Sequence, residues 1–154
     1  QAPGPEYEAS DVTYQVSDDD AEFALDIATA YPPEAGIESW RRSIHCKRDS
    51  SITISDAYKL SSTPSEITCS ILTPCQVDQT EAGPIQLTAR NFHSDRTSGT
   101  GVITYDAAVQ TASLEPISVD DHRLNSVWGD VLHRVVLRSE HPSATGSLTY
   151  TIPP

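Results

Sequence analysis

The sequence has no methionine, no long apolar run and few basic residues, and each scarcity narrows what the chain can be. Methionine is missing even at position 1, so we expect that the chain was cut from a longer protein. The longest apolar stretches, such as residues 135–137, fall far short of the roughly 20 residues that a membrane-spanning helix needs. No membrane span is therefore predicted.

Basic residues are outnumbered: 10 Lys and Arg face 22 Asp and Glu, which gives a formal net charge of −12. Proteins that bind nucleic acid gain affinity from Lys and Arg contacts to phosphate, so this balance argues against a nucleic-acid partner. It argues equally against a broad docking surface for any other polyanion. We interpret the excess acid as the charge that keeps the chain soluble.

The three cysteines, Cys46, Cys69 and Cys75, do not form an even disulfide framework. Their spacing contains no CxxC unit, which argues against a thiolate zinc site. Two interpretations stay open: three buried thiols, which we slightly favour, or one disulfide with one free thiol.

Alternation of polar and apolar residues is the main pattern along the chain, and it is typical of half-buried antiparallel strands. Turn-forming residues separate the alternating segments. The predicted strands cover residues 12–16, 21–28, 37–46, 51–59, 67–72, 85–89, 101–105, 131–138 and 147–152. We therefore expect an all-β chain, an antiparallel β-sandwich of about ten short strands. Residues 1–154 are expected to form a single domain.

The stretch 38–56, ESWRRSIHCKRDSSITISD, gathers many side chains capable of chemistry. Its pattern predicts a strand over residues 37–46, a hairpin connection over 47–50 and an antiparallel partner over 51–59. A structural explanation therefore competes with a catalytic one.

Alternation along the first of these strands places Arg41 and His45 on the outer face and Trp40 on the core face. Arg42 shares the core face with Trp40, where it needs an acidic or carbonyl partner, and Asp56 on the neighbouring strand is the candidate. Because this explanation accounts for every residue, we favour it over a catalytic cluster.

Other candidate motifs also have simpler explanations. Asp120-Asp121-His122 can hold a metal or cap a turn, and capping is the commoner use. Asp18-Asp19-Asp20 lacks the interleaved spacing of a calcium loop and predicts a solvated turn. The chain has no HExxH or GxSxG motif, and residues 98–101, SGTG, read as a turn. These patterns predict no catalytic, cofactor-binding or metal-binding residue.

Several short segments, spread in order over nearly the whole chain, carry a family resemblance. They are YEASDV at 7–12, DIATAYPPEA at 26–35, WRR at 40–42, ITISD at 52–56 with Tyr58, LTP at 72–74, WG at 128–129 and LHR at 132–134. Together they resemble the C-terminal β-region of heparinase II/III-like polysaccharide lyases, which include alginate and oligoalginate lyases.

This resemblance implies a parent enzyme with an N-terminal α/α toroid followed by a β-sandwich. Such enzymes cleave uronate-containing polysaccharides by β-elimination: a base removes the C5 proton and an acid assists the oxygen leaving C4. The family's catalytic Tyr and His lie mostly in the toroid. A further histidine and structural metal ligands lie just upstream of the stretch that resembles residues 1–12. No residue here matches those positions, so Tyr7, Tyr31 and His45 receive no role, and no metal or cofactor is expected.

The expected function is that of a catalytically incomplete C-terminal β-sandwich that supports the toroid and completes one wall of the substrate cleft. The implied partners are the toroid domain of the same parent protein and, through the parent enzyme, an anionic polysaccharide. The implied location is periplasmic or extracellular. Surface left uncovered in such a piece is expected to associate with other molecules.

Two alternatives stay open. A stand-alone carbohydrate-binding module needs exposed aromatic side chains, and with only two Trp and two Phe it would have to use Tyr58, Tyr105 and Tyr150. The other alternative is a structural or adhesion β-sandwich. The sequence names neither the polysaccharide nor the oligomeric state.

Overall fold

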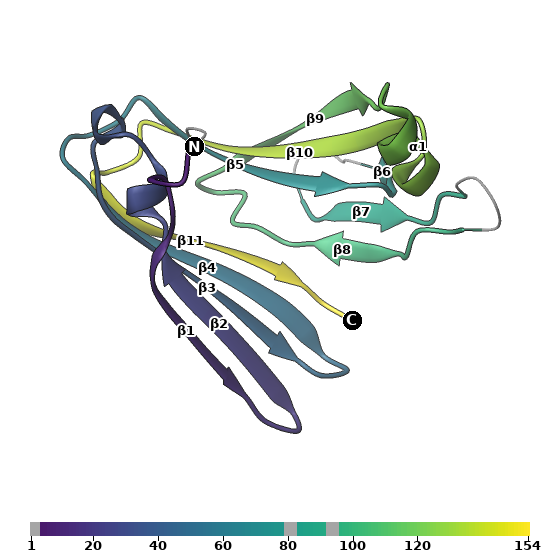
Figure 1. Ribbon diagram of the computed structural model, residues 1–154, viewed down its shortest axis with the longest axis horizontal. Coiled ribbons are helices and arrows are strands. Elements are labelled where there is room, and N and C mark those ends of the chain that lie inside the picture. Colours follow the sequence, from purple (N-terminus) through teal and green to yellow (C-terminus); the bar gives the residue numbers. More distant parts are fainter. Residues whose placement is uncertain (1–3, 79–82, 92–95) are drawn as a thin grey trace. The chain divides into compact units, whose positions relative to one another are not determined.

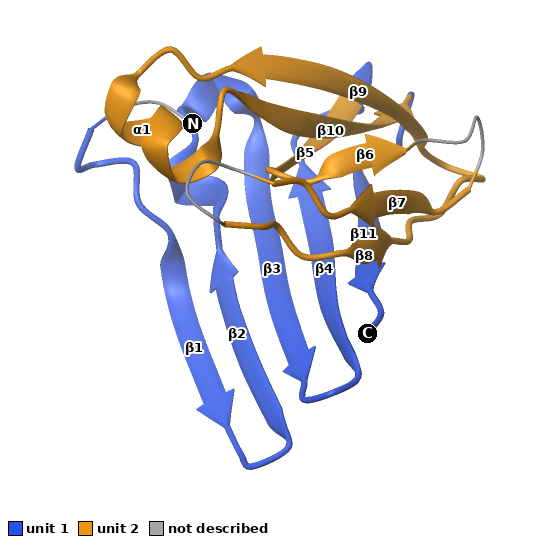
Figure 2. Cartoon of the chain, turned by 90° about the vertical axis from the view of Figure 1, so that its right-hand side faces the viewer, with its two compact units in different colours: residues 1–66, 141–154 blue, residues 67–140 orange. Residues whose placement is uncertain are grey.

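The computed structural model describes residues 4–78, 83–91 and 96–154, and these fold almost entirely as antiparallel β-structure. Strands make up 57% of the chain and helices 9%, which confirms the predicted all-β class. The chain divides into two compact units, one of residues 1–66 and 141–154 and the other of residues 67–140 (Figure 2). Among the described residues, no helix is long and apolar enough to span a membrane.

Unit 1 is built on one five-stranded antiparallel sheet with the order β1-β2-β3-β4-β11 (Figure 1). Its strands are β1 (Ser10–Val16), β2 (Asp20–Asp26), β3 (Ile37–Lys47), β4 (Ser51–Leu60) and β11 (Thr145–Ile152). Two 3-10 turns, Ala28–Ala30 and Pro33–Ala35, connect β2 to β3. The predicted hairpin of β3 and β4 is confirmed, with Lys47 opposite Ser51 at its tip.

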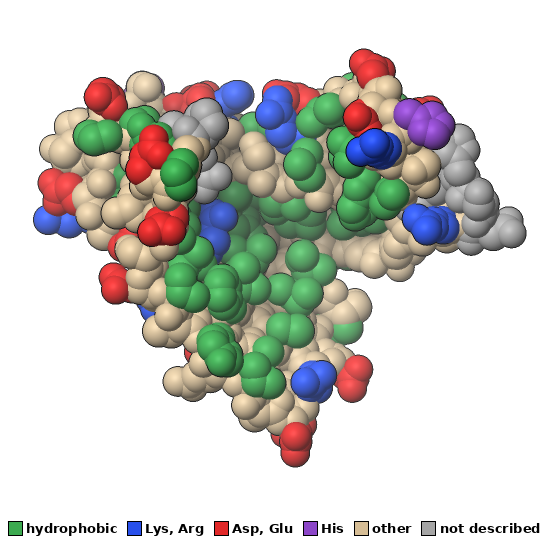
Figure 3. Space-filling model, in the orientation of Figure 1, with side chains coloured by type: hydrophobic (Ala, Val, Ile, Leu, Met, Phe, Trp, Pro, Cys, Tyr) green, Lys and Arg blue, Asp and Glu red, His purple; other side chains and the backbone are tan. Residues whose placement is uncertain are grey.

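The register of these strands gives the sheet two chemically different faces, because successive side chains point to opposite sides. One row across the sheet consists of Tyr14, Phe23, Ile44, Ile54 and Tyr150; we call this side the apolar face. The neighbouring row consists of Gln15, Glu22, His45, Thr53 and Thr151; we call this side the polar face. Figure 3 shows hydrophobic side chains gathered over β1 to β4.

A buried ion pair interrupts the apolar face. The Arg42 guanidinium donates two hydrogen bonds to the Asp56 carboxylate, from Nε to Oδ1 and from Nη2 to Oδ2, each 2.7 Å long. The Asp56 side chain is fully buried, whereas that of Arg42 is 31% exposed. The predicted partner of Arg42 is therefore confirmed.

The next row of the apolar face contains a stacked aromatic pair. The rings of Trp40 and Tyr58 have their centroids 5.2 Å apart. Gly146 lies opposite Tyr58 on β11, and a Cβ at that glycine would come within 2.5 Å of the Tyr58 hydroxyl. A side chain at position 146 would therefore require the Tyr58 ring to shift. Tyr58 is buried, and this burial raises its pKa.

Unit 2 contains two three-stranded sheets and one short helix (Figure 1). One sheet has the order β5 (Glu66–Thr73), β10 (Val131–Glu140), β9 (Thr111–Ser118). The other has the order β6 (Gln76–Asp78), β7 (Ile85–Thr88), β8 (Gly101–Ile103). Both sheets supply almost fully buried side chains, Val135 and Leu137 from the first and Ile85 and Ile103 from the second. Buried side chains from both sheets are expected when two small sheets share one core, as in a sandwich.

The helix α1 (His122–Trp128) explains the Asp120-Asp121-His122 motif. Asp121 is the N-cap residue, and its carboxylate accepts hydrogen bonds from the backbone N–H groups of Arg123 and Leu124 at 2.9 and 3.0 Å. Capping, the favoured interpretation, is thus confirmed. Three strongly exposed apolar residues lie on this helix: Leu124, Val127 and Trp128.

No disulfide joins the three cysteines, and their surroundings are unequal. Cys75 is buried, whereas Cys46 and Cys69 are only half-buried. The expectation of three buried thiols is therefore correct for Cys75 alone. The Cys75 thiol donates a long hydrogen bond to the Gly99 carbonyl at 3.4 Å, and the Cys75 carbonyl lies 2.7 Å from Nδ1 of the buried His133.

Candidate functional site

The polar face of unit 1 carries a groove over β1, β2 and β3, which we call the polar groove. It consists of two adjoining hollows of about 390 and 320 Å³ that share Gln15 and Glu22 in their walls. Its polar lining residues are Thr13, Gln15, Ser17, Asp20, Glu22, Arg41, Ser43 and His45. It is the candidate functional site because it combines an open hollow with several titratable side chains.

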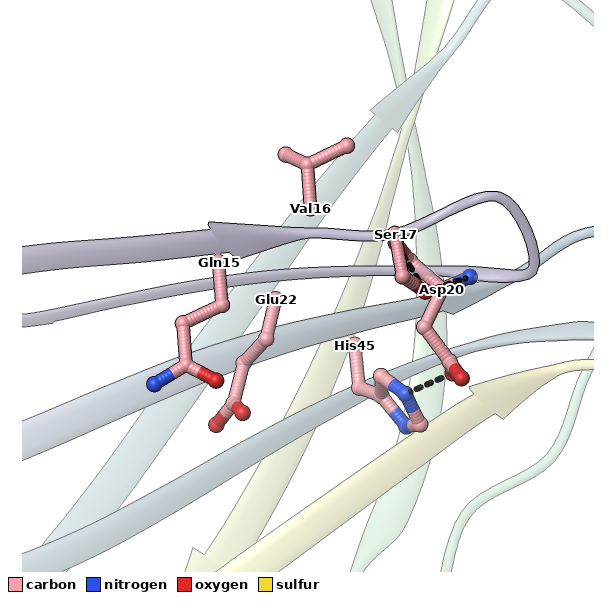
Figure 4. A pocket seen from close by; sticks show the side chains of 6 residues that line it. All are labelled: Gln15, Val16, Ser17, Asp20, Glu22 and His45. Atoms are coloured by element: carbon pink, nitrogen blue, oxygen red, sulfur yellow. Dashed lines mark hydrogen bonds and ion pairs between the residues drawn. The ribbon is translucent and has the colours of Figure 1, made fainter.

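Strand register brings the central side chains of the groove together. Gln15 lies opposite Glu22, and Glu22 lies opposite His45, so three neighbouring strands each place one polar side chain in the same row. Figure 4 shows the Gln15 and Glu22 side chains next to one another and His45 beside Asp20. The row results from the pairing of strands distant in sequence rather than from a local motif.

An imidazole–carboxylate pair closes one end of the groove. His45 Nε2 lies 2.5 Å from Asp20 Oδ1, and both side chains are about half exposed. The turn before Asp20 positions it, because the Ser17 backbone N–H donates to the Asp20 carbonyl at 2.8 Å and the Asp20 N–H donates to Ser17 Oγ at 3.0 Å. The carboxylate therefore holds the imidazole in one orientation while leaving it accessible to solvent.

Arg41 braces the other end of the groove. Its Nη1 donates to the Asp11 carbonyl at 2.7 Å and its Nη2 donates to Thr13 Oγ1 at 3.1 Å, so the side chain reaches from β3 across β2 to β1. Asp11 has a positive φ of 49° at an irregularity in the β1–β2 pairing, and the hydrogen bond from Arg41 falls on this irregular point. Arg41 thus has a structural role.

The middle of the groove holds polar groups that are available to a ligand. Within the ranges that the structure describes, no hydrogen bond or ion pair engages the Glu22 carboxylate or the Gln15 side-chain amide. Gln15 offers both donors and acceptors, and Glu22 offers acceptors. With Asp20 beside them, these groups favour a neutral or cationic polar ligand over an anion. The described residues contain no group of three or more His, Cys, Asp or Glu side chains that could hold a metal.

The structure confirms part of the sequence interpretation of this region. Arg41 and His45 lie on the outer, polar face as predicted, and both line the groove. Tyr7 and Tyr31 do not line it. Sequence reasoning missed Gln15 and Glu22 because only the pairing register shows that their strands lie beside His45. Their positions in alternating segments were the available signal.

Comparison with known proteins finds similar solved structures but no matching family model or curated protein. Among solved structures, the heparan sulfate lyase HepC from Pedobacter heparinus matches with a TM-score of 0.69 and 13% sequence identity. A mutant of the same lyase matches with a TM-score of 0.68 and 13% identity.

These matches cover nearly all of this chain but only a small part of the lyase. Each match covers 96% of this chain but only 22% of the lyase chain. At 13% identity the likeness concerns the fold, so the resemblance expected from the sequence segments is confirmed at that level. The chain has the fold of one part, about a fifth, of a heparan sulfate lyase chain.

Proposed function

We propose that this chain is the C-terminal β-sandwich domain of a polysaccharide lyase that cleaves uronate-containing polysaccharide by β-elimination. The domain supports an N-terminal α/α toroid of the same parent protein and completes one wall of its substrate cleft. The chain does not contain all the residues needed for catalysis, so the polysaccharide binds to the complete parent enzyme rather than to this domain alone. Such a lyase works in the periplasm or outside the cell.

The observation that carries this proposal is the coverage of the fold match. Nearly the whole chain, 96%, corresponds to only 22% of the lyase, as expected for a domain of a larger enzyme. The polar groove agrees with a non-catalytic role, because Asp20 and Glu22 place negative charge in the larger of its two hollows. Negative charge opposes both the binding of a uronate and the formation of a carbanion-like intermediate.

The first experiment is a turnover assay of the chain alone. Alginate, heparin and heparan sulfate are offered separately, and the ultraviolet absorbance of the unsaturated uronate product is followed. We expect no product with any of the three. Turnover would refute catalytic incompleteness, and loss of that turnover in a His45→Gln variant would then identify the polar groove as the active site.

A second experiment tests the parent protein. An antibody raised against the chain is used on extracts of the cells that make it, separated into cytoplasmic, periplasmic and secreted fractions. We expect a polypeptide several times longer than 154 residues in the exported fractions. A band no longer than the chain would refute the domain proposal.

A stand-alone carbohydrate-binding module is the second candidate. Tyr58 and Tyr150 are buried and supply no exposed aromatic surface, so the unengaged Gln15 and Glu22 side chains are what favours it. Because Glu22 repels anions, a neutral oligosaccharide fits this groove better than a uronate. Titration calorimetry with neutral and uronate oligosaccharides tests the candidate, with Gln15→Ala as the groove variant and Thr151→Ala as a control on the same face. Equal heats for both variants and the native chain would exclude the groove as the binding site.

A further inference from the structure

Among the described residues, the strand β1 lies at the edge of the five-stranded sheet and has a partner strand on one side only (Figure 2). All seven of its residues are exposed. Natural edge strands are normally protected by lysine, proline or a covering segment. The segment 12–16, VTYQV, contains no charge, no proline and no glycine, and its Val12, Tyr14 and Val16 side chains are 53%, 77% and 68% exposed.

The hairpin that follows β1 shows which backbone groups point outward. The Ser17 N–H donates to the Asp20 carbonyl at 2.8 Å, so these two residues form a hydrogen-bonded pair. Hydrogen-bonded and non-hydrogen-bonded pairs alternate along an antiparallel ladder. The Tyr14–Phe23 and Val16–Ala21 pairs are therefore non-hydrogen-bonded. The N–H and C=O groups of Tyr14 and Val16 consequently point away from β2.

We propose that β1 pairs antiparallel with β1 of a second copy of this chain, with Tyr14 opposite Tyr14 of that copy. A two-fold axis at Tyr14 places Val12 opposite Val16 of the second copy. Every residue whose backbone groups point outward then meets another such residue, as an antiparallel ladder requires. An axis between two neighbouring residues, such as Thr13 and Tyr14, would face outward groups with inward ones and is excluded. An axis at Thr13 or at Gln15 keeps the direction of the backbone groups but leaves Val16 opposite Ser10, or Val12 opposite Asp18, so only the axis at Tyr14 matches the whole uncharged segment with itself. Two five-stranded sheets would join into one of ten strands.

Charge and apolar surface both fit this register. The nearest acids, Asp11 and Asp18, come opposite Ser17 and Ser10 of the second copy, so no like charges meet. On the apolar face, Tyr14 already lies opposite Phe23, which is 40% exposed. Pairing would continue this row as four aromatic side chains, two from each copy, and cover surface that is otherwise in water.

Self-complementarity identifies a second copy as the occupant. Read in either direction, the uncharged segment 12–16 runs valine, polar residue, tyrosine, polar residue, valine, and a pattern that is symmetric about its centre suits a two-fold interface. A strand from another polypeptide or another domain would need no such symmetry, and it would leave this chain monomeric when purified alone.

Sedimentation velocity over a concentration series tests the proposal. We expect the native chain to form dimers and Tyr14→Pro to weaken the association by about tenfold or more, because each copy loses an outward N–H donor. Tyr14→Thr is the matched control, since it removes the ring and keeps the N–H, and it should retain dimers. Circular dichroism confirms that each variant is folded. A native chain that stays monomeric, or a Tyr14→Pro variant that associates normally, would overturn the proposal.

Cysteine crosslinking tests the register independently of Tyr14→Pro. Residues in a hydrogen-bonded antiparallel pair have Cα atoms about 5.5 Å apart, within the range for a disulfide. Tyr14→Cys should therefore give a covalent dimer under mild oxidation. Val16→Cys should not, because its two copies lie four residues apart along the strands, about 13 Å. The native chain, with its three thiols, supplies the background. Equal crosslinking by the two variants would refute the register.

Discussion

Replacing Arg42 by methionine should destabilise the protein far more than breaking an exposed ion pair on the same two strands. The Asp56 carboxylate is fully buried and receives two hydrogen bonds from Arg42. Arg42→Met leaves this carboxylate in place without its cation. Removal of one partner of a buried pair costs about 3–5 kcal/mol, because the remaining charge has lost both its partner and water.

The expected shift in melting temperature follows from the size of the chain. For domains of about 150–250 residues, 1 kcal/mol corresponds to roughly 2–4 °C, so Arg42→Met should lower Tm by about 10 °C. Urea unfolding, followed by circular dichroism, measures the free energy of unfolding directly. Lys59→Met is the matched control: it breaks the exposed pair with Glu38, 2.6 Å long on the same strand pair, and should cost far less, because both charges are in contact with water.

A double variant separates the cost of an unpaired charge from the value of the pair. Arg42→Met with Asp56→Leu removes both charges and replaces them with apolar groups of similar size. Replacement of both partners of a buried pair is often close to neutral, so the double variant should be more stable than Arg42→Met alone. The reasoning is refuted if Arg42→Met costs no more than Lys59→Met, or if the double variant is less stable than the single one.

Three further predictions concern other contacts. Gly146→Ala should cost about 1–3 kcal/mol in urea unfolding, because its Cβ would press on the stacked Tyr58 ring; Gly99→Ala, with open space around its Cβ, is the control. Asp121→Ala should weaken the α1 cap by about 1 kcal/mol and speed amide exchange in that helix, and unchanged exchange would contradict the cap. Burial raises the pKa of Tyr58 above its ordinary 10.0, so the free energy of unfolding should fall as pH rises from that value toward the higher folded-state pKa. Tyr58→Phe should reduce that fall, and an identical pH profile for variant and native chain would contradict it.

The parts of the fold that could be predicted from the sequence are those in which one face of a strand is buried. Alternation over residues 37–46 and 51–59 was enough to predict both strands, their hairpin and the pairing of Arg42 with Asp56. These features depend on which side chains of a strand point to the same face, and the alternation of polar and apolar residues shows this in the sequence.

The missed elements lack that signal for identifiable reasons. β9 contains Pro116, which argues against a strand, but β9 is an edge strand of its sheet and an edge tolerates proline. β6 has only three residues, too few for alternation to be recognised. The apolar residues of α1 have helical spacing but face solvent, as the 53% exposure of Leu124 shows, so burial does not explain their pattern.

The polar groove could not be predicted from the sequence for a different reason. Its row of Gln15, Glu22 and His45 exists only because β1, β2 and β3 pair in one particular register. Alternation shows which residues share a face of one strand, but it does not show which residues of separate strands become neighbours.

Each compact unit contains one of the two tryptophans, and this distribution makes the protein its own fluorescent reporter. Trp40 in unit 1 is half-buried and stacked on Tyr58, whereas Trp128 in unit 2 is 44% exposed. Their emission maxima should differ, with Trp40 at the shorter wavelength. Trp40→Phe and Trp128→Phe variants would each retain a single tryptophan, so denaturation of either half could be followed separately by tryptophan emission, without any added label.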